Sequence, residues 1–223
     1  MKKIKFSKLI PKIILVSLVI PIIFIIVKLI INGYNSNLIL TLTQCILGIF
    51  AFFIPSILEK KWELEIPPII YISYLIFLYC SIVLGEVRSF YYNGPHWDTM
   101  LHLFSGTMLG IIGFSIIHIL NKKTNLLNLS PMFVCLFSFC FAVTIGVLWE
   151  IYEFSFDGLL NLNMQKFSLN DGTSLIGRKA LYDTMKDLLI DVSGASVAAL
   201  IGYLSIIKDK NWLNNLMIKK TKD

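Results

Sequence analysis

The sequence predicts an all-α protein, a polytopic bundle of about six transmembrane helices that forms a single integral membrane domain over residues 1–223. Hydrophobic residues make up 56% of the chain and charged residues only 15%, whereas a soluble domain carries about 25% charged residues. Six apolar stretches are each long enough to cross a bilayer core, which takes about 20 helical residues. Basic residues gather at alternate ends of these stretches and predict that both termini are cytoplasmic.

Turns and helix-start residues separate the apolar stretches. The polar run Asn32–Ser36 divides the first two spans, and Pro67-Pro68 stands where the third would begin. Pro131 does the same for the fifth span, because proline is tolerated in the first helical turn. The expected spans are residues 9–31, 37–58, 67–87, 98–120, 131–153 and 184–207.

The first span also has features of a signal peptide, since two lysines follow Met1 and precede an apolar run. The run is long for the apolar core of a signal peptide, and no Ala-x-Ala-like cleavage site follows it. We therefore expect residues 1–31 to be a retained anchor. Cleavage would leave the sidedness of the other five spans unchanged.

The distribution of basic residues predicts the orientation. Of the 20 basic residues, 14 fall on the face that both termini share: Lys2, Lys3, Lys5, Lys8, Lys12, Lys60, Lys61, Lys122, Lys123, Lys208, Lys210, Lys219, Lys220 and Lys222. The positive-inside rule places that face in the cytoplasm. We attribute the net charge of +6 to anionic lipid headgroups of the bilayer, and we expect no nucleic-acid partner.

Ionisable residues at the ends of the last three spans form the most specific pattern in the chain. Their spacing of three or four residues places each set on one helix face. The six-span threading brings all three sets to the outer face of the membrane. The sets are Asp98 and His102, then Glu150, Glu153 and Asp157, then Asp183, Asp187 and Asp191.

Some of these residues also have ordinary structural explanations. Asp98 and Asp183 suit the start of a helix, where carboxylates are stabilised. His96 fits a loop, and Glu86 with Arg88 fits a juxtamembrane charge pair. His102, Glu150, Asp187 and Asp191 stand a turn or more inside apolar sequence, whereas Asp157 lies just beyond the fifth span. An unpaired charge is costly inside apolar sequence, so a functional role is the default hypothesis for these four residues.

We predict a divalent-metal site with an inner and an outer set of residues. The inner set is His102, Glu150, Glu153, Asp187 and Asp191, and the rim is Asp98, Asp157 and Asp183. Carboxylates favour Mg²⁺, Mn²⁺ or Ca²⁺, and a histidine shifts the preference toward Mn²⁺ or Zn²⁺. Glu150 and Asp187 are the candidate catalytic residues. No equal set of buried lysines or arginines is available to neutralise the acids.

Two further features bear on this site. The loop 158–182 would cover it and offer Lys166, Arg178 and Lys179 to an anionic headgroup. Small residues let membrane helices approach closely, so the fourth and sixth spans should pack together and bring His102 near Asp187 and Asp191. The small residues are Gly106, Gly110 and Gly113, with Gly194, Ala198 and Gly202. The four cysteines, Cys45, Cys80, Cys135 and Cys140, lie in apolar spans and have no metal-ligand spacing.

Several strings resemble the signature of the YjdF-like bacterial inner-membrane proteins. They are residues 96–106, 149–154, 163–165 and 183–191, within the latter two-thirds of the chain. The resemblance implies a multi-pass protein of the bacterial inner membrane and supports the site more than a reaction. A looser similarity runs to VanZ-like proteins, through Asp98 to His102, Glu150, and Asp187 to Gly194. Asp191 stands where that pattern expects Asn, so a shared reaction is not implied.

These observations leave two main function classes and one minor one. The first is a metal-assisted enzyme that acts on a lipid or cell-envelope precursor at the outer face. The alternative is a proton- or ion-coupled transporter that uses the same carboxylates as relay groups. A structural metal that clamps three helices together is the third. The cytoplasmic halves of the last three spans are apolar, which favours a one-sided site over a pathway.

Overall fold

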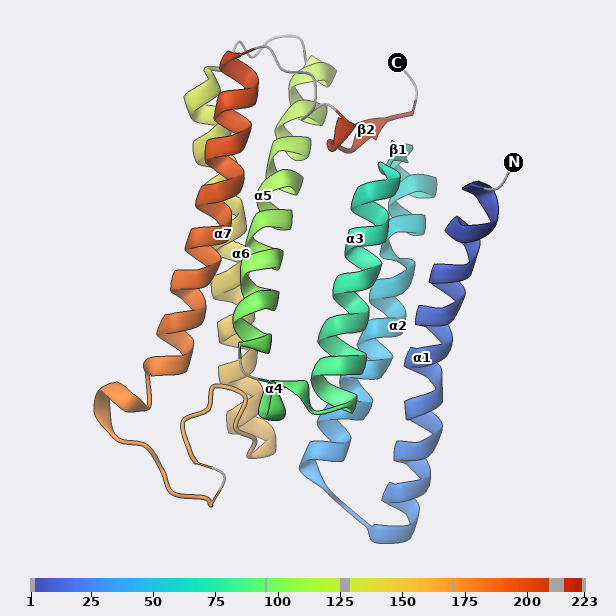
Figure 1. Ribbon diagram of the computed structural model, residues 1–223, viewed down its shortest axis with the longest axis vertical. Helices are drawn as coiled ribbons and strands as arrows, with labels where there is room; N and C mark the ends of the chain where they lie inside the picture. The colour runs from blue at the N-terminus through green and yellow to red at the C-terminus, as the bar shows by residue number, and fades with distance from the viewer. Residues whose placement is uncertain (1–2, 95, 125–128, 170, 209–214, 222–223) are drawn as a thin grey trace. The chain divides into compact units, whose positions relative to one another are not determined.

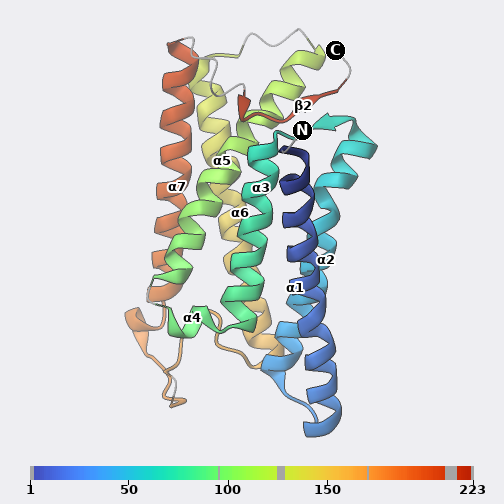
Figure 2. The same ribbon diagram turned by 45° about the vertical axis from the view of Figure 1, so that its right-hand side comes forward.

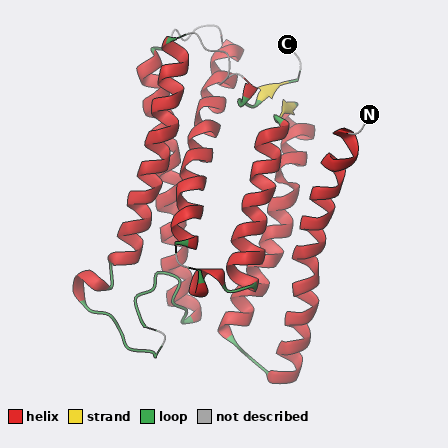
Figure 3. Ribbon diagram, in the orientation of Figure 1, coloured by secondary structure: helices red, strands yellow, loops and turns green. Residues whose placement is uncertain are grey.

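The computed structural model describes residues 3–94, 96–124, 129–169, 171–208 and 215–221, with backbone alone for 3–8 and 122–124. Figure 3 shows that the described chain is mostly helical. Six helices are long and apolar enough to cross a membrane: Leu9–Asn32, Ser36–Trp62, Pro68–Val87, Trp97–Asn121, Pro131–Leu160 and Tyr182–Ile207. The all-α class and the number of spans are therefore confirmed.

The chain divides into two compact units. The first consists of Met1–Glu63 and Pro68–Trp97, and the second of Leu64–Pro67 and Asp98–Asp223. The single domain over residues 1–223 stays a prediction.

The first unit is built from α1 (Lys3–Asn32), α2 (Ser36–Trp62), α3 (Pro68–Leu78), the π-helix η1 (Tyr79–Val87) and the short α4 (Phe90–Asn93). Figures 1 and 2 show α1, α2 and α3 side by side. The Asn35 side chain caps α2 by accepting from the Leu38 amide at 3.0 Å, which explains why the polar turn starts a helix. An aliphatic and aromatic core joins the helices: Ile14, Leu18, Phe52, Leu75, Leu78 and Val83.

The second unit contains three long helices: α5 (Trp97–Thr124), α6 (Pro131–Leu160) and α7 (Tyr182–Ile207). They lie side by side in both ribbon views (Figures 1 and 2). A 3₁₀ turn, η2 (Gly177–Lys179), precedes α7, and strand β1 (Leu64–Glu65) pairs antiparallel with β2 (Lys219–Lys220). Ser130 caps α6 by accepting from the Phe133 amide at 3.2 Å, with Pro131 in the first turn as expected.

The expected packing of the fourth and sixth spans is confirmed. A Cβ atom built on Gly106 would stand 2.7 Å from the Asp191 carbonyl oxygen, and one on Gly194 would stand 2.5 Å from that of Leu103. Larger side chains at either position would force α5 and α7 apart. Gly113 differs, because its Cβ would meet Ser138 Cα at 2.7 Å, so this glycine faces α6 and not α7.

The fifth span is longer than expected. The sequence predicts an end at residue 153, yet α6 continues to Leu160 and ends at Asn161, whose φ of 56° is left-handed. Asp157 therefore lies inside the helix and is buried, with 7% of its surface exposed, where the prediction put it just beyond the span. The apolar residues around it extend the helix, and its carboxylate is satisfied by the following loop. Lys2, Lys210 and Lys222 lie outside the described residues, and the cytoplasmic placement of the termini stays a prediction.

Candidate functional site

The site begins at the first two turns of α5, where Asp98 and His102 are one turn apart. His102 is buried, and its Nε2 lies 3.6 Å from Asp98 Oδ1 while its Nδ1 lies 3.2 Å from Asp191 Oδ2. One carboxylate belongs to the same helix and the other comes from α7. The imidazole is therefore held by an acid on each ring nitrogen. A metal-binding histidine has this arrangement when one nitrogen faces the ion and the other donates to a carboxylate.

Three side chains from α5 and α7 converge closely enough to share an ion. One potential ligand atom from each of Asp98, His102 and Asp187 lies within 4.8 Å of the other two. Asp187 is 2% exposed, and its buried Oδ1 has no hydrogen bond in the described part of the chain. Its nearest recorded cation is Lys186 Nζ, at 3.5 Å. Asp98, which the sequence placed at the rim, is a member of this group.

Helix α6 adds two buried glutamates from its last turns. Both carboxylate oxygens of Glu150 are buried and have no hydrogen-bond partner among the described residues. Gln165 and Thr184 lie near this carboxylate and bond to each other at 2.9 Å. Glu153 accepts from the Trp149 indole nitrogen at 3.0 Å. Glu150 is thus the least satisfied acid of the site, which an ion or a substrate could correct.

Asp157 has a different role from the one that the sequence suggested. Its two carboxylate oxygens accept from the backbone amides of Met164 at 2.7 Å and Gln165 at 3.0 Å. Asn163 adds two bonds to the Ser168 backbone, at 2.8 and 3.0 Å. These contacts fold the segment after α6 back toward the site. Asp157 therefore anchors a loop, and its membership of the metal set stays a prediction.

Lys166, held by this loop, enters the site. Its ammonium donates to Asp98 Oδ2 at 2.6 Å and to Asp183 Oδ1 at 3.1 Å. Burial disfavours the charged form of Lys166, but the two carboxylates outweigh burial and raise its pKa above the ordinary value. The backbone at Lys166 is left-handed, with a φ of 49°. Only a bent loop can turn this side chain back onto α5 and α7.

This contact corrects one expectation drawn from the sequence. Lys166 was expected to face an anionic headgroup, but its ammonium pairs with Asp98 and Asp183 within the protein. One half-buried lysine does not match the number of acids, in agreement with the expectation that no equal set of buried basic residues neutralises them. Arg178 and Lys179 lie exposed in η2, as a headgroup-binding role would require. The polar string 163–165 just before Lys166 was the only signal that could have revealed a structured loop.

The eight predicted site residues thus fall into three groups. Asp98, His102 and Asp187 form the candidate ligand set, and Asp191 orients His102. Glu150 and Glu153 approach from α6. Asp157 and Asp183 hold the loop and its lysine. The four cysteines are free and belong to no such group.

Comparison with known proteins gives a consistent assignment. The family described as "Predicted membrane protein (DUF2238)" matches residues 13–208. A Thermotoga maritima protein named "Uncharacterized protein" is similar, with 32% identity over 162 residues, which is 70% of this chain and 76% of that protein. No solved structure matches. DUF2238 is the YjdF family, which agrees with the resemblance in the motifs, and the looser similarity to VanZ-like proteins stays a prediction. Because the match covers most of its length, the chain belongs to the DUF2238 family of predicted membrane proteins.

Proposed function

We propose that this protein binds a divalent cation through Asp98, His102 and Asp187, and that the ion assists a reaction on a lipid or cell-envelope precursor. The main support is that one potential ligand atom from each of these three side chains lies within 4.8 Å of the other two. Under the predicted orientation the site faces the outer side of a bacterial inner membrane. An integral membrane protein with a site at that depth meets lipid-linked substrates directly.

The charge balance supports a bound cation. Besides the three ligands, the acids Glu150, Glu153, Asp183 and Asp191 belong to the same region. The described part of the chain offers them Lys166, the partly exposed Lys186 and His102, which is a cation only when it is protonated. Buried carboxylates without a partner are costly. A dication would offset the excess and would satisfy Asp187 Oδ1, which lacks a hydrogen bond among the residues that the structure describes.

The geometry also suggests how each residue would serve the ion. The Nδ1 of His102 would donate to Asp191, which orients the ring and leaves Nε2 for the metal. Two carboxylates and one imidazole suit Mn²⁺ or Zn²⁺ better than Mg²⁺ or Ca²⁺. When bound, such an ion polarises a phosphoryl or carbonyl oxygen or activates water. Glu150, whose two carboxylate oxygens have no hydrogen bond within the described ranges, is the candidate general base or additional ligand.

A proton- or ion-coupled carrier is the competing function, and the structure of the second unit disfavours it. A carrier needs ionisable or polar groups that continue through the membrane. Further along α5 and α6, the buried polar side chains include Ser115 and Ser138. Their hydroxyls donate to their own helix, at Ile111 and Val134. Such bonds offer no relay toward the other face, so a one-sided site is the better explanation.

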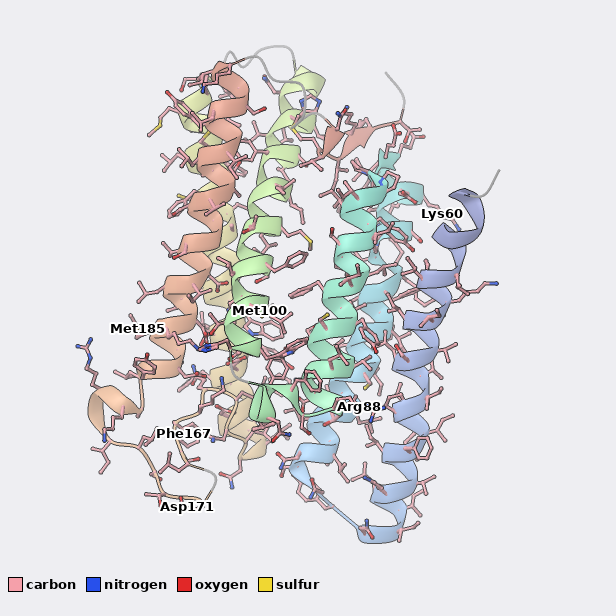
Figure 4. The ribbon with its side chains drawn as sticks, in the orientation of Figure 1. Lys60, Arg88, Met100, Phe167, Asp171 and Met185 are labelled. Atoms are coloured by element: carbon pink, nitrogen blue, oxygen red, sulfur yellow. The ribbon has the colours of Figure 1, made fainter. Side chains whose placement is uncertain are left out.

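The proposal is tested by metal content and by stability. Purified protein should retain Mn²⁺ or Zn²⁺ in elemental analysis, and added ion should raise the melting temperature of chelator-treated protein. Asp187→Asn keeps the side-chain shape but removes its charge, so it should lose most of the bound metal. Asp171→Asn is the matched control, because Asp171 is an exposed acid at the loop tip (Figure 4). Wild-type protein that holds no metal and gains no stability from any of the four ions contradicts the proposal and favours the carrier.

The Glu150→Gln variant distinguishes an ion that assists a reaction from an ion that only holds the helices together. If the ion assists a reaction, this variant should stay folded with metal bound and yet fail to complement a deletion strain. If the ion only clamps helices, Glu150→Gln should complement whenever it is stable. The same elemental analysis and melting curve report on both possibilities.

A further inference from the structure

We propose that the first unit binds a phospholipid whose headgroup carries both a phosphate and a primary amine. The lipid would enter a cavity of about 680 Å³, which is lined by residues of α1, α2, η1 and α4. All of these elements belong to the first unit. The inference uses none of the metal-site residues and is independent of the function proposed above.

The cavity has one polar end with charges of both signs. Glu86 lines it, and Glu86 Oε1 accepts from the Thr41 hydroxyl at 3.2 Å. The other carboxylate oxygen has no recorded hydrogen bond within the described ranges. Lys28 and Arg88 also line the cavity and are exposed, and neither forms an ion pair with a carboxylate in the part of the chain that is described. The sequence suggested that Glu86 and Arg88 pair, and no such pair is found among these residues.

The rest of the cavity is mostly apolar and extends toward the middle of the spans, where the Ser17 hydroxyl donates to the Ile14 carbonyl of its own helix. Ile20, Phe24 and Ile25 of α1 line it, as does Val83 of η1. Between Ser17, the deepest lining residue of α1, and Lys28 are eleven helical steps, or roughly 16 Å at about 1.5 Å per residue. The cavity is therefore long enough for a headgroup and the upper part of an acyl chain.

The position of the polar end matches the interface of a bilayer. Lys28 precedes the end of the first span at Asn32, Thr41 follows the start of the second at Ser36, and Glu86 precedes the end of the third at Val87. A lipid places its headgroup at this level and its chains toward the middle of the spans. The amphipathic lining thus has the same polarity gradient as a phospholipid.

The charges select among headgroups. Lys28 and Arg88 suit a phosphate, and an arginine binds its oxygens with two parallel hydrogen bonds. Glu86 has a free carboxylate oxygen that suits an ammonium donor. A glycerol headgroup has no positive charge to offer Glu86, and a choline headgroup has no N–H to donate. A primary amine satisfies both requirements.

The π-helical geometry of η1 supports a binding role for this wall. Tyr79, Val83, Glu86 and Val87 all belong to η1 and all line the cavity. π-Helical turns are rare and are frequently found at functional sites. Here η1 brings an acid, a tyrosine and two valines onto the same wall.

Lipid retention measured by native mass spectrometry tests the proposal. Purified protein is exchanged into micelles with equimolar phosphatidylethanolamine, phosphatidylglycerol and phosphatidylcholine, and retained lipids are identified. Wild-type protein should retain phosphatidylethanolamine preferentially. Glu86→Gln should reduce that preference about tenfold, the loss expected for one charge-assisted hydrogen bond. Lys28→Gln combined with Arg88→Gln should lower retention of all three lipids.

Two further variants keep the test independent of folding. Glu59→Gln makes the same change at an exposed site of α2. The neighbouring Lys60 lies at the opposite end of the unit from Arg88 (Figure 4), so retention should not change. Ile20→Trp, at a half-exposed lining residue, should fill the apolar part and expel every lipid. Equal retention of the three lipids by wild type, or an unchanged preference in Glu86→Gln, overturns the proposal.

Discussion

Replacing Lys166 with methionine tests the reasoning about the site most directly. The change keeps a long flexible side chain and removes the ammonium that bonds to Asp98 and Asp183 at 2.6 and 3.1 Å. Without the ammonium, two carboxylates lose their cation in a poorly solvated place. The variant should therefore be less stable than wild type when no metal is bound.

The burial of the three side chains sets the size of the effect. Removing one partner of a buried ion pair costs about 3–5 kcal/mol, and an exposed pair contributes about 0–1 kcal/mol. Lys166 is 34% exposed, whereas Asp98 and Asp183 are 16% and 12% exposed. We expect an intermediate loss of about 2–3 kcal/mol. That corresponds to a fall of roughly 5–10 °C in melting temperature.

The response to metal should change in the opposite direction. Asp98 is both a partner of Lys166 and a candidate ligand. Once its lysine is gone, Asp98 keeps only His102 as a possible cationic partner in the described part of the chain, so a dication stabilises it more than in wild type. Mn²⁺ should therefore raise the melting temperature of Lys166→Met by more than it raises that of wild type.

Thermal melts of chelator-treated protein, with and without Mn²⁺, measure both effects. Lys179→Met is the control, because Lys179 is an exposed lysine in the same connection between α6 and α7. It should melt like wild type under both conditions. An unchanged melting temperature for Lys166→Met without metal would refute the ion-pair argument. A smaller Mn²⁺ response would refute the assignment of Asp98 as a ligand.

Three other predictions follow from the same structure. Asp157→Asn should loosen the loop after α6 and lower the unfolding free energy by about 2 kcal/mol, because two backbone amides lose a charged acceptor. Faster hydrogen exchange over residues 162–168 would show this loosening, and unchanged exchange would contradict it. The pKa of Lys166 is raised, so its stabilisation is fully present below the ordinary lysine value near 10.4 and is lost only as pH rises through the higher folded value. The difference in unfolding free energy between wild type and Lys166→Met should thus stay constant from neutral pH to about pH 10. A difference that disappears below that pH would contradict the ion-pair argument. Single cysteines are introduced at Ser7 and Ser168 in a cysteine-free background, and intact cells are treated with an impermeant thiol reagent. Only position 168 should be labelled, and the reverse pattern would invert the predicted orientation.

Much of the fold could be predicted because the bilayer imposes a simple rule on sequence. An apolar stretch of about 20 residues is needed for each crossing, and six such stretches are visible between proline and polar breaks. The boundaries agree within a few residues except at the fifth span. There the acids Glu153 and Asp157 looked like an end to the membrane helix. The helix continues past both, because Glu153 accepts from Trp149 of the same helix and Asp157 accepts from the backbone of the following loop.

The site could be predicted in its membership more than in its roles. Helical spacing alone put Asp98 with His102 and aligned Asp187 with Asp191. Small residues on α5 and α7 then predicted that these two pairs would meet, and His102 lies beside Asp191 as expected. Which carboxylate contacts His102 and which one joins the candidate ligand set was not visible, because Asp187 and Asp191 stand at equivalent positions of the same helical repeat.

By itself, the sequence determined the class, the number of spans and the three acidic faces, since each depends on local periodicity and hydropathy. Only the tertiary structure decided that Lys166 neutralises Asp98, 68 positions away in the chain. It also decided that Asp157 holds a loop and that the Glu150 carboxylate has no hydrogen bond in the described part of the chain. These outcomes depend on the path of an irregular loop with a left-handed residue. No periodic pattern records such a path, because it is set by the contacts that the loop makes once the helices have packed.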